Sequence, residues 1–156
     1  MRSWWAWLLV SAVVIVLDQT TKYAITQSFH FGEYLPVTSF FNLVLTYNTG
    51  AAFSLLADAG GWQHIFFVAV AVVASVVIVY LLRKHRDDRL FSFSLALILG
   101  GALGNLIDRI AIGKVVDFLD FYVGTYHWPA FNIADSAITV GALLLVWDSF
   151  KKPKSA

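Results

Sequence analysis

The sequence lacks cysteine and is poor in charge, with 13% charged residues and a formal net charge of +1 among its 156 residues. Without cysteine the chain has no disulfide, no thiolate nucleophile, no cysteine-ligated metal and no lipid-modified cysteine of its own. A nucleic-acid partner is also excluded, because neutralising phosphates requires a basic face. The four histidines show no metal-ligand spacing, and no GxSxG motif is present. We therefore expect neither a metal nor a cofactor.

What the chain has in excess is apolar surface. Hydrophobic residues make up 59% and aromatic residues 16% of the sequence, too much for one small soluble core. A bilayer core of about 30 Å requires about 20 apolar residues in a helix. Four stretches qualify, roughly 4–25, 62–82, 90–107 and 131–150. This pattern predicts an all-α membrane fold with four transmembrane helices, forming a single integral membrane domain over residues 1–156.

The distribution of Lys and Arg predicts the orientation of the chain in the membrane. Basic residues occur at Arg2, within 83–89 and within 151–154, whereas the segment 26–61 contains none. Short loops rich in Lys and Arg remain in the cytoplasm. Both termini are therefore expected to be cytoplasmic. The two long connections are expected on the opposite side.

The first outer connection is predicted to contain strands. Residues of about 31–56 are rich in Thr, Val, Phe and Tyr and are interrupted by Pro36, Asn48 and Gly50. This composition favours short strands joined by turns. We expect a small extracytoplasmic β-sheet at the outer membrane surface.

Polar residues recur at one depth in three of the predicted helices. Asp18, Asn105 and Asp135 each lie about 21 to 22 Å from the cytoplasmic end of their helix at 1.5 Å per residue. Polar groups in hydrocarbon cost about 2.5 to 3.5 kcal/mol each, so each requires a partner or a function. Asp18 and Lys22 are four residues apart and can pair. That pair fits two interpretations, a simple helix-end ion pair or support for an active site.

Carboxylates remain as the candidates for chemistry. Two close acids cannot both ionise, so one keeps its proton while the other activates a water molecule. Asp135 is one natural member, and Asp108, Asp117 and Asp120 are possible partners that spacing does not separate. Asp108 adjoins Arg109 and also fits an ion pair at a helix end. Asp117 lies in an apolar setting that perturbs acidity, and Asp120 is expected to be solvated or interfacial.

Two other functional classes compete with a hydrolase on these residues alone. A proton-coupled transporter also uses intramembrane acids, but it predicts acids near the midplane, whereas here they gather toward one face. A non-catalytic membrane scaffold leaves the buried acids unexplained.

Five motifs in order resemble one family over essentially the whole chain. They are DQTTK (18–22), YNTGAAFS (47–54), GNLIDR (104–109), VVDF (115–118) and FNIADS (131–136). Together they resemble the lipoprotein signal peptidases, or signal peptidase II. The resemblance implies an aspartyl endopeptidase that removes signal peptides from diacylglyceryl-modified prolipoproteins, cleaving before the lipidated cysteine.

The resemblance also assigns residues. It selects Asp117 and Asp135 as the catalytic pair over the other acids. Supporting or substrate-binding roles are implied for Asp18, Lys22, Asn48, Asn105, Arg109 and Asn132, to which we add Asp108 at the helix end and Gly50 in the turn.

The same resemblance sets expectations for location and partners. It implies a multi-pass protein of the bacterial inner membrane, with the active site toward the periplasmic face and a short periplasmic helix beside the sheet. The implied partners are a lipid-modified prolipoprotein, membrane phospholipid and the inhibitor globomycin. We expect the chain to work as a monomer.

Overall fold

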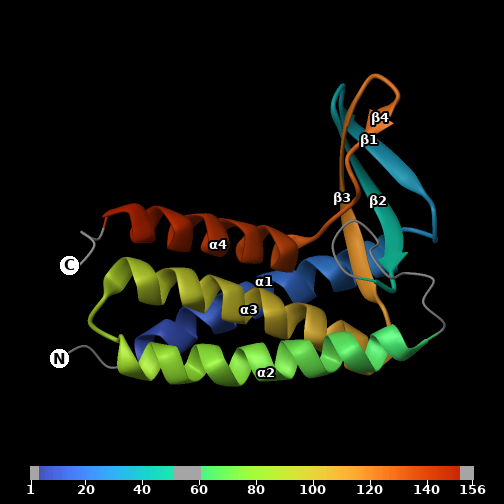
Figure 1. Cartoon of the computed structure of the whole chain (residues 1–156). Coiled ribbons are helices and arrows are strands. Elements are labelled where there is room, and N and C mark those ends of the chain that lie inside the picture. The colour runs from blue at the N-terminus through green and yellow to red at the C-terminus, as the bar shows by residue number, and fades with distance from the viewer. Residues whose placement is uncertain (1–3, 51–60, 152–156) are drawn as a thin grey trace.

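The computed structural model describes residues 4–50 and 61–151. Its elements are, in order, α1 (Trp5–Ser28), β1 (Tyr34–Thr38), β2 (Phe41–Asn48), α2 (Trp62–Lys84), α3 (Arg89–Ile112), β3 (Val115–Val123), β4 (Tyr126–His127) and α4 (Ile133–Lys151). The helices lie side by side as a bundle, and the sheet stands across one end of it (Figure 1). The expected fold class is confirmed. The described residues do not include the short extra helix, and residues 51–56 of the predicted β region lie outside them.

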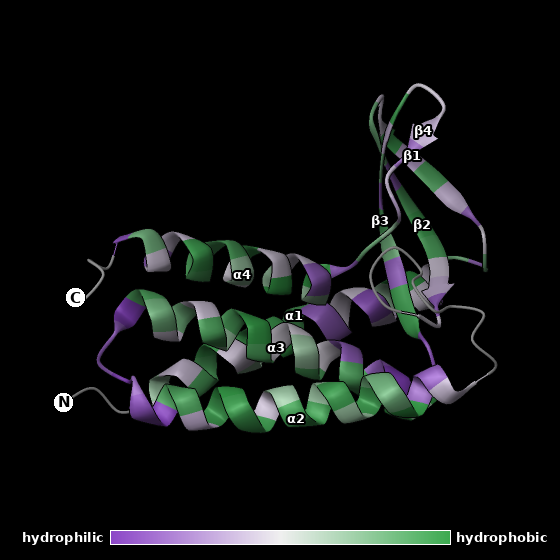
Figure 2. Ribbon diagram, viewed as in Figure 1, coloured by the Kyte–Doolittle hydropathy of each residue, from purple (hydrophilic) through white to green (hydrophobic). Residues whose placement is uncertain are grey.

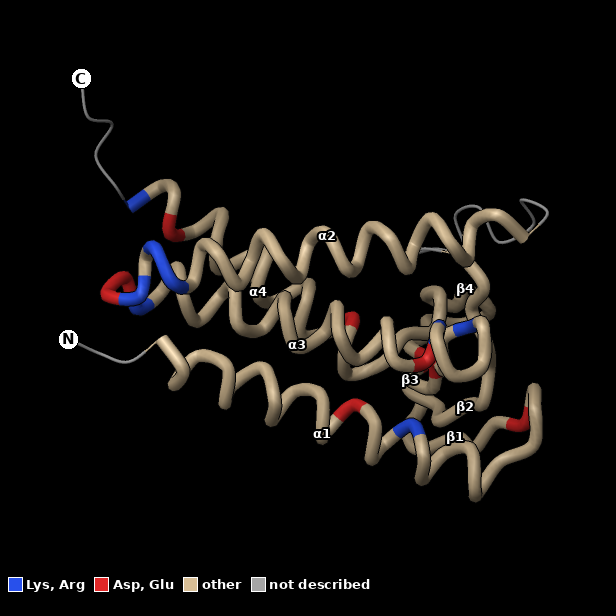
Figure 3. The backbone as a smooth tube through the Cα atoms, turned by 90° about the horizontal axis from the view of Figure 1, so that it is seen from below, with Lys and Arg blue, Asp and Glu red and all other residues tan. Residues whose placement is uncertain are grey.

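All four helices are long and apolar enough to cross a membrane. Their shafts are mostly apolar, and hydrophilic residues gather toward their ends (Figure 2). Large apolar side chains such as Leu9 and Leu143 point outward, with 69% and 65% of their surface exposed. Such surfaces are stable against lipid rather than water. Lys and Arg residues cluster at the end of the bundle where both termini lie (Figure 3).

Helix α3 is the centre of the bundle and packs against the other three helices. Glycines allow the close approach. A Cβ atom added at Gly100 would lie 2.7 Å from Cβ of Val14, and one added at Gly104 would lie 2.7 Å from Oδ2 of Asp18. Small residues let helix backbones approach closely in membranes. In this bundle the close approach also brings a polar residue of α1 directly against α3.

The sheet is antiparallel throughout, in the order β1-β2-β3-β4. The sequence predicted strands within 31–56 only, and β3 and β4 come instead from the connection between α3 and α4. Strand β3 is rich in β-branched and aromatic residues, which favour strands. Helix α3 ends at Gly113, whose φ of 75° lets the chain leave the helix and enter β3.

One face of β3 is fixed to the end of α1. Val116 and Phe118 pack with Ile25 of α1 and Leu45 of β2 in a buried apolar cluster. Because side chains alternate across a strand, the residue between them points to the other face. That residue is Asp117. The apolar cluster therefore determines the direction in which this acid points.

Candidate active site

The N-terminus of α4 positions the first candidate acid. Oδ1 of Asn132 accepts a hydrogen bond from the backbone N–H of Asp135 at 2.8 Å, which makes Asn132 the N-cap of the helix. Oδ1 of Asp18, on α1, accepts from the N–H of Ala134 at 2.9 Å. Two N–H groups that a helix end leaves free are thus satisfied. An acidic residue in the first turn is also favoured by the helix dipole.

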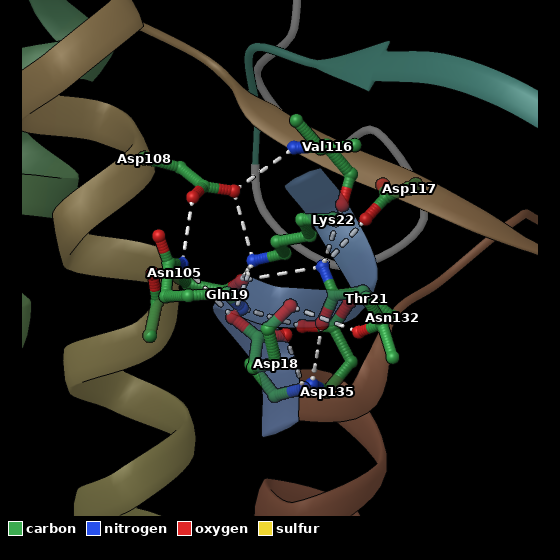
Figure 4. A network of polar contacts seen from close by, with 12 residues as sticks. Asp18, Gln19, Thr21, Lys22, Asn105, Asp108, Val116, Asp117, Asn132 and Asp135 are labelled. Atoms are coloured by element: carbon green, nitrogen blue, oxygen red, sulfur yellow. Dashed lines mark hydrogen bonds and ion pairs between the residues drawn. The ribbon is translucent and has the colours of Figure 1, made fainter. Parts of the chain in front are cut away.

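Asn132 joins the two candidate acids. Its Nδ2 donates to Oδ1 of Asp117 at 2.7 Å, while its own oxygen holds Asp135 as described. Nδ2 of Asn105 donates to Oδ1 of Asp135 at 2.8 Å, and the side chain of Asn48 hydrogen-bonds Asp117. The close-up shows the side chains of Asp117, Asn105 and Asp135 converging on Asn132 from β3, α3 and α4 (Figure 4). The fold thus brings Asp117 and Asp135 into one network.

The environment of Asp117 alters its acidity. Only 2% of this residue is exposed. Burial, followed by the negative charge of Asp135, raises the pKa of Asp117 to about 7, against the opposing hydrogen bond from Asn132 and the charge of Lys22. Burial and a nearby like charge both disfavour a carboxylate. An acid with such a pKa exchanges its proton near neutral pH, as acid–base catalysis requires.

A buried lysine links three further predicted residues. Nζ of Lys22 lies 2.8 Å from Oδ2 of Asp18 and 2.8 Å from Oδ2 of Asp108. It also donates to Oδ1 of Asn105 at 2.9 Å. The predicted pairing of Asp18 with Lys22 is therefore confirmed. Because Asn105 in turn bonds Asp135, the lysine is part of the site rather than a separate helix-end pair.

The ion pair of Asp108 with Arg109, one of the alternatives for this acid, does not form among the described residues. Asp108 pairs instead with Lys22, because Asp108 and Arg109 both lie in α3, where adjacent side chains point about 100° apart. Oδ2 of Asp108 also accepts a hydrogen bond from the N–H of Val116 at 3.1 Å. Nη2 of Arg109 donates instead to the carbonyl oxygen of Gly50 at 2.9 Å.

Sequence reasoning missed Gln19. Its Nε2 lies 2.9 Å from Oδ1 of Asp108, 3.1 Å from the carbonyl oxygen of Gly104 and 3.2 Å from Oδ2 of Asp18. It therefore ties α1 to α3 beside Lys22. The available signal was an amide side chain within a membrane span, next to Asp18.

Asp120 was expected to be solvated or interfacial, and the structure excludes a solvated position. Only 9% of this residue is exposed. Its carboxylate accepts a hydrogen bond from Nδ2 of Asn42 at 2.8 Å and lies 2.9 Å from Nδ1 of His127. These partners come from β2 and β4, so only the strand register reveals them.

A cavity of about 860 Å³ opens beside the acids, between α2, α3, α4 and the sheet. Its lining is mainly apolar, with polar groups from Asn48, Asn105, Arg109 and Asp135. The guanidinium of Arg109 also lies 5.2 Å from the ring of Phe67. Buried Asp117 does not contribute to the lining among the described residues. No three His, Asp or Glu side chains in residues 4–50 and 61–151 are grouped to hold a metal ion.

Fold and site together define a class, a polytopic helical membrane protein with two acids, buried Asp117 and cavity-lining Asp135, beside an apolar cavity. Two solved bacterial membrane enzymes share the fold. One has a TM-score of 0.84 and 34% identity, covering 97% of this chain and 94% of that chain. The other has a TM-score of 0.82 and 33% identity, covering 95% and 94%.

The sequence comparisons agree with the fold. Residues 10–151 match the family profile described as signal peptidase (SPase) II. A lipoprotein signal peptidase of Cupriavidus taiwanensis is 60% identical over 146 residues, covering 94% of this chain and 83% of that protein. One of Burkholderia mallei is 58% identical over 150 residues, covering 96% and 90%. This chain belongs to the signal peptidase II family.

Proposed function

We propose that the protein is an aspartyl endopeptidase that removes signal peptides from diacylglyceryl-modified prolipoproteins, cleaving before the lipidated cysteine. The relatives named lipoprotein signal peptidase support the substrate class. The observation that carries the catalytic proposal is the bridge through Asn132, which joins Asp117 to Asp135. Burial and the charge of Asp135 also raise the pKa of Asp117 to about 7, which suits a group that exchanges a proton near neutral pH.

The chemistry follows from a pair that holds one proton. The ionised carboxylate takes a proton from a water molecule, whose oxygen attacks the scissile carbonyl carbon. The protonated carboxylic acid donates its proton to the carbonyl oxygen. Collapse of the tetrahedral intermediate breaks the C–N bond, and the leaving nitrogen receives a proton from the pair. The titration belongs to the pair and not to either residue.

The supporting residues act by holding the pair in place. Asp18 bonds the N–H of Ala134, directly before Asp135, and Asp108 bonds the N–H of Val116, directly before Asp117. Lys22 contacts both of these supporting acids. One buried cation therefore fixes the backbone on the N-terminal side of each catalytic residue. Catalytic groups require such placement, because small displacements are costly in rate.

Asn105 and Arg109 also hold groups of the site in place. Asn105 accepts a hydrogen bond from the Lys22 ammonium and donates one to Asp135. The second bond fixes the orientation of the Asp135 carboxylate. Arg109 bonds Gly50 and lines the cavity. We assign it the role of holding the turn after β2 and a carbonyl or phosphate group of a bound molecule.

The orientation follows from the charges. The cationic end of the bundle carries both termini (Figure 3). Asp117 on β3 and Asp135 in the first turn of α4 belong to the opposite end of the bundle, where the sheet stands (Figure 1). Because basic ends remain in the cytoplasm, we assign the site to the periplasmic face of the bacterial inner membrane. The scissile segment of a substrate with its signal helix and lipid chains in the bilayer would reach the acid pair near the periplasmic boundary of the membrane. We assign the apolar cavity wall to substrate or phospholipid chains and to globomycin, and take the working unit as a monomer.

The test uses purified Asp117→Asn and Asp135→Asn variants in detergent with a diacylglyceryl-modified prolipoprotein. Each variant is expected to lose at least about 10³-fold in cleavage rate, since general acid–base groups contribute about 10² to 10⁴-fold. Asp87→Asn, with 70% of its side chain exposed, is the matched control and keeps the wild-type rate. Wild-type cleavage by either site variant would exclude the pair.

A further inference from the structure

Asp120 is a buried acid that the proposed reaction does not use. It lies on β3 three residues after Asp117 and does not line the cavity among the described residues. Its carboxylate is held from β2 by Asn42 at 2.8 Å and from β4 by His127, whose Nδ1 lies 2.9 Å from each oxygen. A buried carboxylate without partners is costly. These contacts therefore define a specific position for the histidine.

His127 connects this acid to the wall of the cavity. Its ring stacks on Tyr122 with centroids 5.0 Å apart and planes inclined by 16°. Strand β4 has only two residues and two register pairs with β3. Such a short pairing is weak alone, because a stable sheet edge requires longer strands. The contact with Asp120 adds a charge-assisted bond, about twice as strong as a neutral one.

The four residues after His127 form what we call the cavity wall, residues 128–131. All four line the large cavity. The wall is attached to β3 at both ends. Backbone N–H of Trp128 donates to the carbonyl of Phe121 at 2.8 Å, and Phe131 exchanges bonds with Leu119 at 3.1 and 2.9 Å.

Trp128 separates two spaces. Its side chain lines the large cavity and also a second pocket of about 260 Å³ that is formed with Phe40, Phe121, Tyr122, Val123 and Tyr126. Movement of this side chain would open one space at the expense of the other. His127 directly precedes Trp128, so its contact with Asp120 adds a third fixed point to the wall beside the two backbone attachments. It therefore helps to set the shape of the cavity that Trp128 and Asp135 both line.

We propose that Asp120 and His127 are positioning residues that set substrate affinity by holding the cavity wall in place. The proposal rests on the proposed function, because the cavity is taken as the substrate site. Neither side chain touches the reacting atoms. Their loss should weaken binding of the prolipoprotein and leave the chemical step almost unchanged.

The experiment measures KM and kcat for a diacylglyceryl-modified prolipoprotein with purified His127→Leu and Asp120→Asn variants. Each is expected to raise KM by about tenfold, which corresponds to ~1.4 kcal/mol, with kcat within about twofold of wild type. His127→Gln retains an N–H donor toward Asp120 and should restore most of the lost affinity. The double variant should be no worse than His127→Leu alone, because both changes remove one interaction.

The matched control is His30→Leu. His30 also contacts an acid through Nδ1, at 3.2 Å from Glu33, but its side chain is 99% exposed. Its KM should equal that of wild type. A wild-type KM in His127→Leu, or a fall in kcat with KM unchanged, would overturn the proposal. Failure of the proposed function looks different, since Asp117→Asn would then still cleave.

Thermal unfolding of each variant guards against a folding defect. If His127→Leu does not fold, the comparison of His127→Gln with Asp120→Asn decides the matter. A raised KM in Asp120→Asn and a smaller rise in His127→Gln support the proposal. Equal wild-type KM values in both contradict it.

Discussion

Asp117→Asn is expected to stabilise the folded protein at alkaline pH while removing activity. Burial and the charge of Asp135 raise the pKa of Asp117 from 3.8 to about 7. The folded chain therefore holds this proton more tightly than the unfolded chain does. Stability from this group is fully present below about pH 4 and is lost as pH rises toward about 7.

The magnitude follows from the same values. The pKa of Asp117 is about three units higher in the folded chain than in the unfolded chain, and each unit corresponds to about 1.36 kcal/mol. At pH 8 the ionised carboxylate therefore destabilises the folded state by about 4 kcal/mol. The amide of the variant is neutral at every pH and retains an oxygen that accepts the hydrogen bond from Asn132. The variant should therefore unfold at a higher temperature, by about 10 °C at pH 8, since 1 kcal/mol moves Tm by about 2 to 4 °C at this size.

Thermal unfolding in detergent, followed by tryptophan fluorescence at about pH 5 and pH 8, measures the difference. The gap between variant and wild type should be large at pH 8 and shrink toward pH 4. Asp87→Asn makes the same chemical change at an exposed site and should show no such trend. A variant no more stable than wild type at pH 8, or a gap independent of pH, would refute the assignment of a raised pKa.

Two further substitutions test the supporting network. Lys22→Met leaves Asp18 and Asp108 buried without their cation, and breaking such a pair costs about 3 to 5 kcal/mol. Thermal unfolding should show a large loss, and a Tm close to wild type would contradict the buried network. Asn132→Ala removes both the cap of α4 and the bond to Asp117. It should lose about 1 kcal/mol of stability and at least about tenfold in kcat, and an unchanged kcat would show that the bridge is not needed for catalysis.

Hydropathy and length were sufficient to predict the four spans, because a helix in lipid must satisfy its backbone internally and so requires a long apolar run. The convergence of Asp18, Asn105 and Asp135 was also predictable, since helical rise places them at one depth. In the structure these residues are connected through Lys22, Asn132 and the N-terminus of α4.

The sequence did not predict β3 and β4, for a physical reason. The pairing of β3 with β2 joins residues that are distant in sequence, and no local signal in β3 identifies β2 as its partner. Within 115–123 only the motif VVDF (115–118) was identified, and no strand was predicted there, although its valines and aromatics favour a strand. Without the register, the burial of Asp120 by Asn42 was not predictable.

The partner of Asp135 could not be chosen from local sequence either. Spacing alone left Asp108, Asp117 and Asp120 equivalent. In the structure the three acids have different partners. Lys22 pairs with Asp108, His127 lies against Asp120, and Asn132 joins Asp117 to the backbone N–H of Asp135. The resemblance to a family supplied that choice before the contacts were known.

The central claim, that two acids share one proton, is tested most directly by the pH dependence of kcat/KM for prolipoprotein cleavage. This quantity reports the essential acid and base of the free enzyme. A shared proton predicts a bell-shaped profile whose two limbs report the pair. The alkaline limb should fall near pH 7, because burial and the charge of Asp135 raise the pKa of Asp117 to about 7. A rate that stays level from about pH 6 to about pH 9 would contradict it.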